Sequence, residues 1–233
     1  MGAGGKIFDW LRMLYERMNY TVRHNSEMFY SFKSGIGILI KDVESPVLWN
    51  LFLADFVLHP DTDDVVLAGS LITSLEQADD IISISKTPEG LQRMMNALGR
   101  WCSRNFMSIN AIKSYVMVFG PLPFVVPNFS FDGTPVGVTH QQTYVGVSFT
   151  STSRNIFDNH YNVKASKAWA VGNLIFGMES SVGILPPSEG KTLYMSLLDP
   201  HLTHGAEVCL DIDPKSIQPL EDVPFHMTSS GPE

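Results

Sequence analysis

The order in which helical and strand-like apolar patterns follow one another is the strongest constraint on how this chain can fold. Helical spacing predicts helices over five segments, at residues 7–18, 45–58, 87–106, 160–178 and 187–198. Extended patterns lie between them, at residues 19–24, 27–32, 65–67, 70–76, 81–85, 115–119 and 136–149. This order predicts an α+β fold with a mainly antiparallel sheet packed on helices.

Two of the helices begin at a Ser-Pro or Thr-Pro pair, which combines an N-cap residue with a proline suited to the first helical position. Ser45-Pro46 opens a helix that runs to about Leu58 and is apolar nearly all round, so we expect it to be central and buried. Thr87-Pro88 opens the next helix by the same logic. Asn25-Ser26 and Asp132-Gly133 predict turns between extended segments.

The composition is typical of a globular intracellular protein. With 233 residues and 44% hydrophobic side chains, the chain can bury a substantial core, which excludes the disordered and fibrous classes. Cys102 and Cys209 form no CxxC pair, so neither a disulfide framework nor a zinc site is expected. The longest apolar run, residues 46–58, is too short to span a bilayer and contains Asp55, and no secretory signal is visible. We therefore expect a soluble protein of the nucleus or cytoplasm, neither secreted nor in a membrane.

The charge distribution argues against strong nucleic-acid binding by this chain alone. The net charge is −8. Residues 1–41 carry six basic and three acidic side chains, whereas residues 199–233 carry one basic and seven acidic side chains. Phosphate binding depends on clustered cations that release counterions. Any grip on nucleic acid is therefore expected from the N-terminal segment, from metal ions or from other parts of a longer protein.

Two adjacent acids lie between two strand-like runs. Asp79-Asp80 follows residues 72–75 and precedes residues 81–84, so we expect the pair at the tip of a hairpin. Adjacent carboxylates repel each other, and a divalent cation would relieve the repulsion, since Mg²⁺ prefers carboxylate and phosphate oxygens. A solvated turn explains the same dipeptide, because Asp is a common turn residue. The dipeptide alone is a weak signal.

Three further segments accompany the acids in a fixed order. A glycine-bearing segment with Gly35 and Gly37 runs upstream into Lys41-Asp42-Val43-Glu44-Ser45-Pro46. Downstream of the acids come Asn110-Ala111-Ile112-Lys113-Ser114 and then Tyr144-Val145-Gly146-Val147. Four ordered motifs are far more specific than any one of them alone.

This order resembles the palm of reverse transcriptases, in particular those of fungal non-long-terminal-repeat retrotransposons. In that family a glycine loop and buried helix (motif B) precede an Ala-Asp-Asp hairpin (motif C). A helix ending in an Asn-x-x-Lys-Ser turn (motif D) and a Tyr-Leu-Gly primer-grip strand (motif E) follow. The likeness extends from about Gly5 to Asp213 and includes Asp199-Pro200-His201-Leu202-Thr203-His204-Gly205. It implies a partial palm over residues 1–150 and a thumb-like helical region over 151–213, and the Pro- and Ser-rich residues 214–233 are expected to form a loose tail.

The resemblance implies nucleotidyl transfer by two metal ions, Mg²⁺ or else Mn²⁺, with an RNA template, a DNA primer and deoxynucleoside triphosphates as partners. Asp79 and Asp80 would be the metal-ligating acids, and Lys113 would donate a proton near the leaving phosphate. Tyr144 and Gly146 would place the primer terminus. The residues that would line the nucleotide and template are Gly37, Lys41, Asp42, Ser45 and Pro46. On spacing alone, the lysine is an exposed turn residue, and the tyrosine and glycine belong to an ordinary half-buried strand.

Three departures from the family pattern lead us to expect a catalytically weak or inactive chain. Motif A places an aspartate on a strand before the first helix, and the residues before Ile7 offer none, while Asp9 lies on the polar side of that helix. Lys41 stands at the glycine of motif B, so freedom at positive φ is lost and a cation approaches the nucleotide. Gln77 replaces the usual aromatic residue before Ala-Asp-Asp.

Two other metal-like patterns are set aside. The acidic loop at residues 61–64 lacks the glycine and the final glutamate of an EF-hand, and we expect it to be solvated. His201 and His204 lie near Asp199, but we expect a satisfied loop there, because no groups that would orient them as ligands are evident.

Two functions stay open at the level of the sequence. The first is a template-directed polymerase remnant, and the second is a non-enzymatic scaffold or interaction protein that kept the palm fold. Asp79-Asp80 favours an origin as a polymerase, whereas the altered motifs favour a non-enzymatic present role. An unrelated α+β domain is a remote third alternative.

Overall fold

The computed structural model describes residues 4–35, 37–39, 41–121, 127–183, 185–209 and 214–229, with side chains described through residue 223 in the last range. The chain forms two compact units, Met1–Val57 and Leu58–Glu233. The division therefore follows residue 57, whereas the sequence places the end of the first domain at residue 150.

The first unit begins with the amphipathic helix α1 (Lys6–Arg17), as its apolar spacing predicts. A short hairpin follows, in which β1 (Arg23–His24) pairs antiparallel with β2 (Glu27–Met28) around the predicted turn. The pairing resumes at Tyr20 and Phe32, whose backbones exchange two hydrogen bonds of 2.8 Å and whose rings stack 5.9 Å apart. The predicted helix and hairpin are confirmed.

Helix α2 (Ser45–Leu53) differs from its prediction at both ends and on its surface. Its N-cap is Glu44, and Ser45 is the first helical residue, with a buried Oγ that has no hydrogen-bond partner among the described residues. Val47 and Leu51 are 60% and 52% exposed, so the expectation of a helix buried on every side is wrong. An apolar composition predicts burial only where neighbouring elements cover each face, and a nine-residue helix in this small unit is not covered that way.

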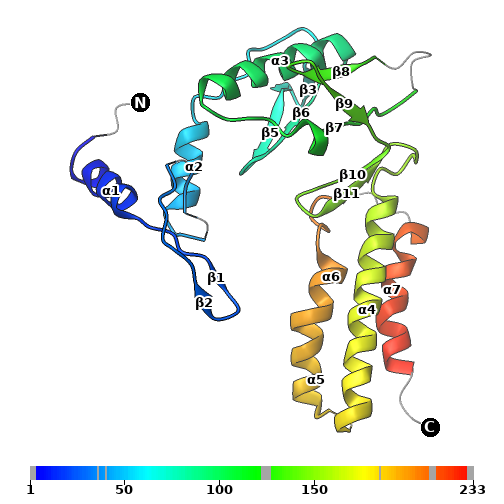
Figure 1. Cartoon of the computed structure of the whole chain (residues 1–233). Helices are drawn as coiled ribbons and strands as arrows, with labels where there is room; N and C mark the ends of the chain where they lie inside the picture. Colours follow the sequence, from blue (N-terminus) through cyan, green and yellow to red (C-terminus); the bar gives the residue numbers. More distant parts are fainter. Residues whose placement is uncertain are drawn as a thin grey trace. The chain divides into compact units, whose positions relative to one another are not determined.

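The second unit opens with two antiparallel hairpins. β3 (Val65–Leu67) pairs with β4 (Ser70–Ile72), and β5 (Ser74–Gln77) pairs with β6 (Asp80–Ser83). The second hairpin is drawn in cyan beneath helix α3 in Figure 1. The predicted returning strand and its tight acidic connection are confirmed.

Helix α3 (Pro88–Arg104) begins as the sequence predicts. The Thr87 hydroxyl is the N-cap and accepts a hydrogen bond of 3.0 Å from the Gly90 amide, which satisfies one of the free amides of the first turn. The same hydroxyl donates to the Asp63 carboxylate at 2.7 Å. The cap therefore also ties the helix to the acidic loop that precedes β3.

That acidic loop is fastened to α3 instead of being solvated. Arg93 donates to Asp61 at 2.7 and 2.9 Å and to Asp63 at 2.6 Å. Asp64 is fully buried and accepts a bond of 2.8 Å from the Asp61 amide. The Arg93 guanidinium lowers the pKa of Asp61, and Thr87 together with Arg93 lowers the pKa of Asp63. The prediction of a solvated loop is wrong. Arg93, which binds the loop, lies some thirty residues further along the chain, so a local sequence pattern could not reveal it.

A three-stranded sheet lies against α3. β7 (Tyr115–Val116) pairs parallel with β9 (Thr134–Val138), which pairs antiparallel with β8 (Phe129–Phe131) across the predicted turn. The Gln92 side chain of α3 bonds the Ser130 backbone in both directions, at 2.8 and 3.1 Å. The buried residues of this core are Met95, Val116, Phe129 and Val136. β7 is shorter than the strand predicted for residues 115–119.

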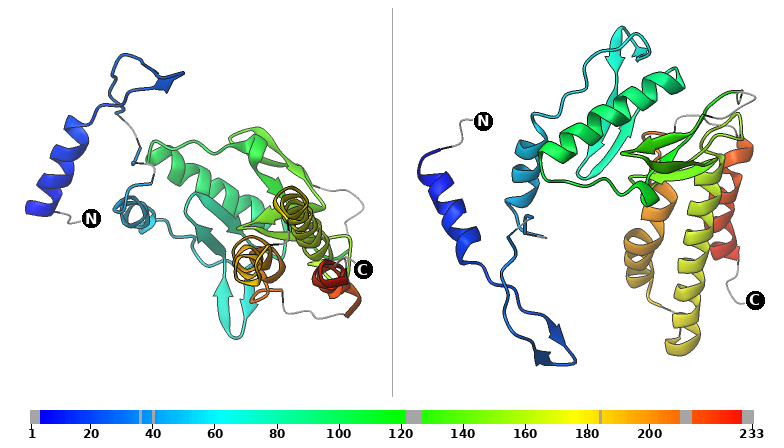
Figure 2. Two further views of the ribbon diagram at one scale, coloured as in Figure 1. Left: turned by 90° about the horizontal axis from the view of Figure 1, so that it is seen from below. Right: turned by 45° about the horizontal axis from the view of Figure 1, so that its top comes forward.

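A further hairpin leads into the helical part of the unit (Figures 1 and 2). β10 (Gln141–Tyr144) pairs antiparallel with β11 (Val147–Thr150), and helix α4 (Asp158–Val182) follows. The helices after α4 are α5 (Pro187–Leu193), the π-helical turn η2 (Tyr194–Leu198), α6 (Asp199–Thr203) and α7 (Pro214–Ser229). The helices predicted at residues 160–178 and 187–198 are confirmed.

Residues 214–229 form a helix where the sequence predicts a loose tail. α7 runs alongside α4, as Figure 1 shows, and Val223 is fully buried in the core of this region. The other buried members of that core are Ala165, Ala168 and Leu198. The proline and serine content masked an apolar spacing of three at Ile217, Leu220 and Val223, which places these residues on one side of a helix.

The molecule is mixed α and β and belongs to the α+β class. Within the described residues the strands form four two-stranded sheets and one three-stranded sheet. The predicted antiparallel pairing holds for every strand pair except β7 with β9, but it is spread over small sheets. Among the described helices, none combines the length and the hydropathy that a membrane crossing demands.

Candidate functional site

The two acids lie at the tip of the β5–β6 hairpin. Asp79 occupies the two-residue turn with Ala78, and Asp80 is the first residue of β6, opposite Gln77. Ala78 has a φ of 54°, a left-handed conformation that is unfavourable for alanine. Both carboxylates belong to exposed residues, so they are open to water and to ions.

The aromatic residue of motif E lies against this hairpin. The Tyr144 hydroxyl, at the end of β10, donates to the Leu75 carbonyl of β5 at 3.5 Å. Partial burial raises the pKa of the Tyr144 hydroxyl, and the nearby charges of Asp80 and Glu76 raise it further. Tyr144 therefore contacts β5, the strand that leads into the acids, at a residue 69 positions earlier in the chain.

Motif E spans the tip of a hairpin: Tyr144 ends β10 and Val147 begins β11, as the strand prediction has it, but Gly146 lies in the turn between them. Val145 and Gly146 connect β10 to β11 with φ values of 47° and 80°, and two successive positive values are typical of tight hairpin turns. A Cβ on Gly146 would lie 2.5 Å from His204 Nε2, so the glycine is required by conformation and by packing. Alternation in the sequence did not reveal the turn, because the β-branched Val145 is an unusual residue for positive φ.

The motif D segment forms the expected turn. Asn110 caps the short 3₁₀ helix η1 (Ala111–Lys113), its side chain accepting from the Lys113 amide at 3.2 Å. The Ser114 hydroxyl donates back to the Asn110 carbonyl at 2.9 Å. Lys113 is exposed at the end of this helix, and in the described part of the chain no ion pair joins it to Asp79 or Asp80.

The motif B segment keeps the backbone shape that its sequence appeared to forbid. Gly37 has a φ of 102°, and Lys41 has a φ of 67° despite its side chain. The expectation that lysine would lose positive φ is wrong, because the backbone adopts that conformation and bears the strain. Asp42 is half-buried, Ser45 is buried, and Pro46 is exposed within the first turn of α2.

The hairpin tip carries two exposed acidic residues, Asp79 and Asp80. Among the described residues there is no group of three or more His, Cys, Asp or Glu side chains that could hold a metal ion. Mg²⁺ is commonly bound through one or two carboxylates and completes its octahedral shell with water and substrate phosphates. Asp79 and Asp80 supply two carboxylates, the residue type that this binding mode uses.

The sequence did not reveal that two histidines pack against the β10–β11 hairpin. His160 of α4 is 2% exposed, and its ring bonds the Ser148 amide of β11 and the His204 carbonyl. His204 follows α6, in the segment where the sequence predicts a loop, and its ring lies against the turn at Gly146.

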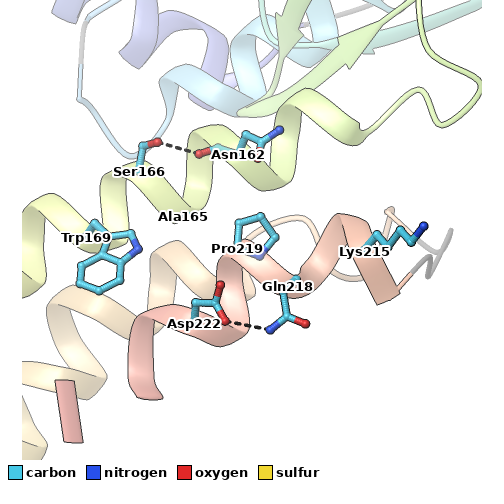
Figure 3. A pocket seen from close by; sticks show the side chains of 8 residues that line it. All are labelled: Asn162, Ala165, Ser166, Trp169, Lys215, Gln218, Pro219 and Asp222. Carbon is cyan, nitrogen blue, oxygen red and sulfur yellow. Dashed lines mark hydrogen bonds between the residues drawn. The ribbon is translucent and has the colours of Figure 1, made fainter. Parts of the chain in front are cut away.

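An open groove lies between α4 and α7, far along the chain from the acids (Figure 3). Trp169 forms part of its wall, and two polar pairs line it. Gln218 donates to Asp222 at 2.8 Å, and Ser166 donates to the Asn162 carbonyl at 2.9 Å. These polar groups are engaged within their own helices, so the groove shows no converging set of ligand-binding atoms.

The expected site is divided between the two units. Asp79, Asp80, Lys113, Tyr144 and Gly146 belong to the second unit, where the tyrosine contacts the acidic hairpin. The remaining expected residues, Gly37, Lys41, Asp42, Ser45 and Pro46, belong to the first unit. Comparison with protein-family models and with curated proteins finds no match for the chain.

Proposed function

We propose that the chain is a reverse transcriptase-like palm fragment whose β5–β6 hairpin binds a divalent cation through Asp79 and Asp80. The observation that carries the proposal is the contact of Tyr144, from motif E, with the strand that leads into the acids of motif C. The Tyr144 hydroxyl reaches the Leu75 carbonyl at 3.5 Å, and burial raises the pKa of that hydroxyl, with a further contribution from the charge of Asp80. A polymerase needs this proximity, because the primer end must lie beside the metal-binding acids.

The proposed ancestral reaction is RNA-directed DNA synthesis from deoxynucleoside triphosphates. A divalent cation bound at the acids supplies neutralisation of the triphosphate and of the leaving pyrophosphate. Lys113 would donate a proton at the leaving phosphate, and Tyr144 with Gly146 would hold the primer terminus.

We propose further that polymerase activity in this chain is weak or absent. Two-metal catalysis distributes two ions over three carboxylates, and the hairpin supplies two of them. A primer-extension assay with Mg²⁺ or Mn²⁺ tests this directly, with an Asp79→Asn variant as the control. We expect incorporation at or near the level of the control. Robust incorporation that the variant abolishes would show that the chain is an active polymerase.

The alternative is a non-enzymatic scaffold that has kept the palm fold, and the acidic net charge of −8 favours it as the present role. Calorimetric titration with Mg²⁺ separates the two proposals. A polymerase remnant that retains its cation site gives a saturable heat change on titration, and the Asp79→Asn variant loses this heat change. Absence of binding by the parent chain would leave the scaffold.

A further inference from the structure

We propose that His160 and His204 are positioning residues, which hold the β10–β11 hairpin so that Tyr144 stays against the hairpin of Asp79 and Asp80. The proposal rests on the proposed function only in that this alignment would serve the cation site. The contacts that carry it lie within the second unit, and they can be measured without metal or nucleotide.

The first contact fixes β11 to helix α4. His160 is 2% exposed, and its Nδ1 accepts a hydrogen bond of 3.2 Å from the Ser148 amide. Because Nδ1 is the acceptor, the ring proton resides on Nε2, which donates to the His204 carbonyl at 2.9 Å. One neutral imidazole therefore joins α4, β11 and the segment that follows α6.

The second contact fixes the turn of the hairpin. The His204 ring approaches Gly146 so closely that a Cβ there would lie 2.5 Å from Nε2 and 3.1 Å from Cε1. Gly205 packs in the same manner against His160, where a Cβ would lie 2.9 Å from Nε2, and it has a φ of 84°. Two glycines and two histidines thus interlock, each glycine opposite the ring of one histidine.

The third contact links this interlock to the acids. Tyr144 and Val147 are paired at the end of the hairpin, so the position of the turn determines where the tyrosine ring lies. Its hydroxyl meets the Leu75 carbonyl of β5 at 3.5 Å. Val147 of the hairpin also packs with Tyr161 and Cys209, so loss of the His160 or His204 contact would loosen the turn without freeing the whole hairpin. The loosened turn would let Tyr144 move away from Leu75.

The test reads the position of Tyr144 directly, in the full chain without metal. Tyrosine is replaced throughout by 3-fluorotyrosine, and the ¹⁹F resonance of Tyr144 is assigned from the Tyr144→Phe variant. His160→Phe keeps a ring but removes both hydrogen bonds, so we expect the pKa of the fluorinated Tyr144 to fall toward the value of unperturbed 3-fluorotyrosine. His160→Asn keeps an acceptor for the Ser148 amide and should restore part of the shift. Hydrogen exchange of the Ser148 amide should be about tenfold faster in His160→Phe, as expected for one lost hydrogen bond.

His204→Ala is a second variant, for the case that His160→Phe does not fold. It should leave the fold intact, because the His204 side chain is exposed and the backbone carbonyl that binds His160 is retained. We expect the same direction of change in the Tyr144 titration. A double-mutant cycle adds a second criterion. Gly146→Ala should accelerate Ser148 exchange more in the presence of the His204 ring than in the His204→Ala background, because only the ring meets the new Cβ.

A purely structural role for the histidines would lower the free energy of unfolding while leaving the Tyr144 titration unchanged in the folded protein. An unchanged Tyr144 titration in both His160→Phe and His204→Ala would therefore overturn the proposal. The outcome is separate from that of the proposed function, since a chain that binds no cation can still show the Tyr144 shift. Conversely, cation binding at Asp79 without any Tyr144 shift would retain the function and remove the positioning role.

Discussion

The buried imidazole of His160 is held in one protonation state by its two hydrogen bonds. Both ring nitrogens form hydrogen bonds, Nδ1 as an acceptor and Nε2 as a donor. A second proton on Nδ1 would therefore point at the Ser148 N–H and break that hydrogen bond. Burial lowers the pKa of the imidazole, the hydrogen bond to the His204 carbonyl partly opposes this, and the charges of Lys164 and His204 lower it further. The folded protein therefore keeps this histidine neutral at a pH where the unfolded chain already binds a proton.

We predict that the free energy of unfolding falls as the pH is lowered from the ordinary histidine value of 6.5 toward the depressed value of folded His160. In this window the unfolded state binds more protons than the folded state, so stability rises with pH. Urea unfolding at several pH values measures the slope. In His160→Asn the part of the slope due to this residue should disappear. An equal slope in the variant would assign the pH dependence to other groups.

At the scale of the element, the start of α3 shows how closely a helix can be set against a loop. A Cβ on Gly90 would lie 2.3 Å from Ser85 Oγ and 2.7 Å from Asp63 Cβ. The cap at Thr87 and the bonds from Arg93 bring the loop into this position. A glycine in the first turn is therefore required by packing, although glycine is a poor helix former.

We predict opposite effects for two glycine-to-alanine substitutions in helices. Gly90→Ala should destabilise the protein by about 1–3 kcal/mol, because the added methyl group overpacks the contact with the loop. Gly177→Ala, within α4, should stabilise it by about 0.5–1 kcal/mol, since a Cβ there meets nothing within 4 Å. Denaturant unfolding of both variants checks the pair. Equal effects of the two substitutions would contradict the packing described for Gly90.

The elements that local patterns could predict are those whose signals lie within a few residues. The cap and proline at Thr87-Pro88 and the turns at Asn25-Ser26 and Asp132-Gly133 are of this kind. The acidic loop was misjudged, because its partner Arg93 lies on a helix that comes later in the chain. The burial of α2 was also misjudged, since its apolar residues do not reveal which faces of the helix have neighbours.

At the scale of the whole molecule, the helical region depends on the segment that the sequence predicted to be loose. Val223 of α7 is fully buried with Leu198 and two alanines of α4. Because these residues come from three separate segments, their burial joins α4, η2 and α7 into one core. The C-terminal helix is thus a structural part of the second unit.

We predict that Val223→Ala lowers the free energy of unfolding by about 2 kcal/mol, through lost burial and the cavity that remains. Glu221→Ala, at an exposed neighbouring position of the same helix, should change it by less than about 0.5 kcal/mol. Denaturant unfolding compares the two variants. Matching small effects would mean that α7 is not packed on α4 as described.

The candidate site could be predicted from the sequence as a set of motifs, and its geometry could not. The hairpin with Asp79 and Asp80 and the turn with Lys113 are local features and were predicted. The contact of Tyr144 with β5 and the interlock of His204 with Gly146 join residues that are distant in the chain. Such contacts arise from the packing of several elements, which spacing along one chain does not encode.

The central claim, a divalent cation held at the β5–β6 hairpin, is tested most directly by paramagnetic broadening from Mn²⁺ in the NMR spectrum of the full chain. At a small fraction of one equivalent of Mn²⁺, we predict selective loss of the backbone amide signals of residues 78–81 and of the Tyr144 ring signals. Asp79→Asn should largely abolish the loss. Asp132→Asn, at the turn of another hairpin with a single acid, should not affect it. Broadening that persists in Asp79→Asn, or that is equally strong around Asp132, would contradict the account.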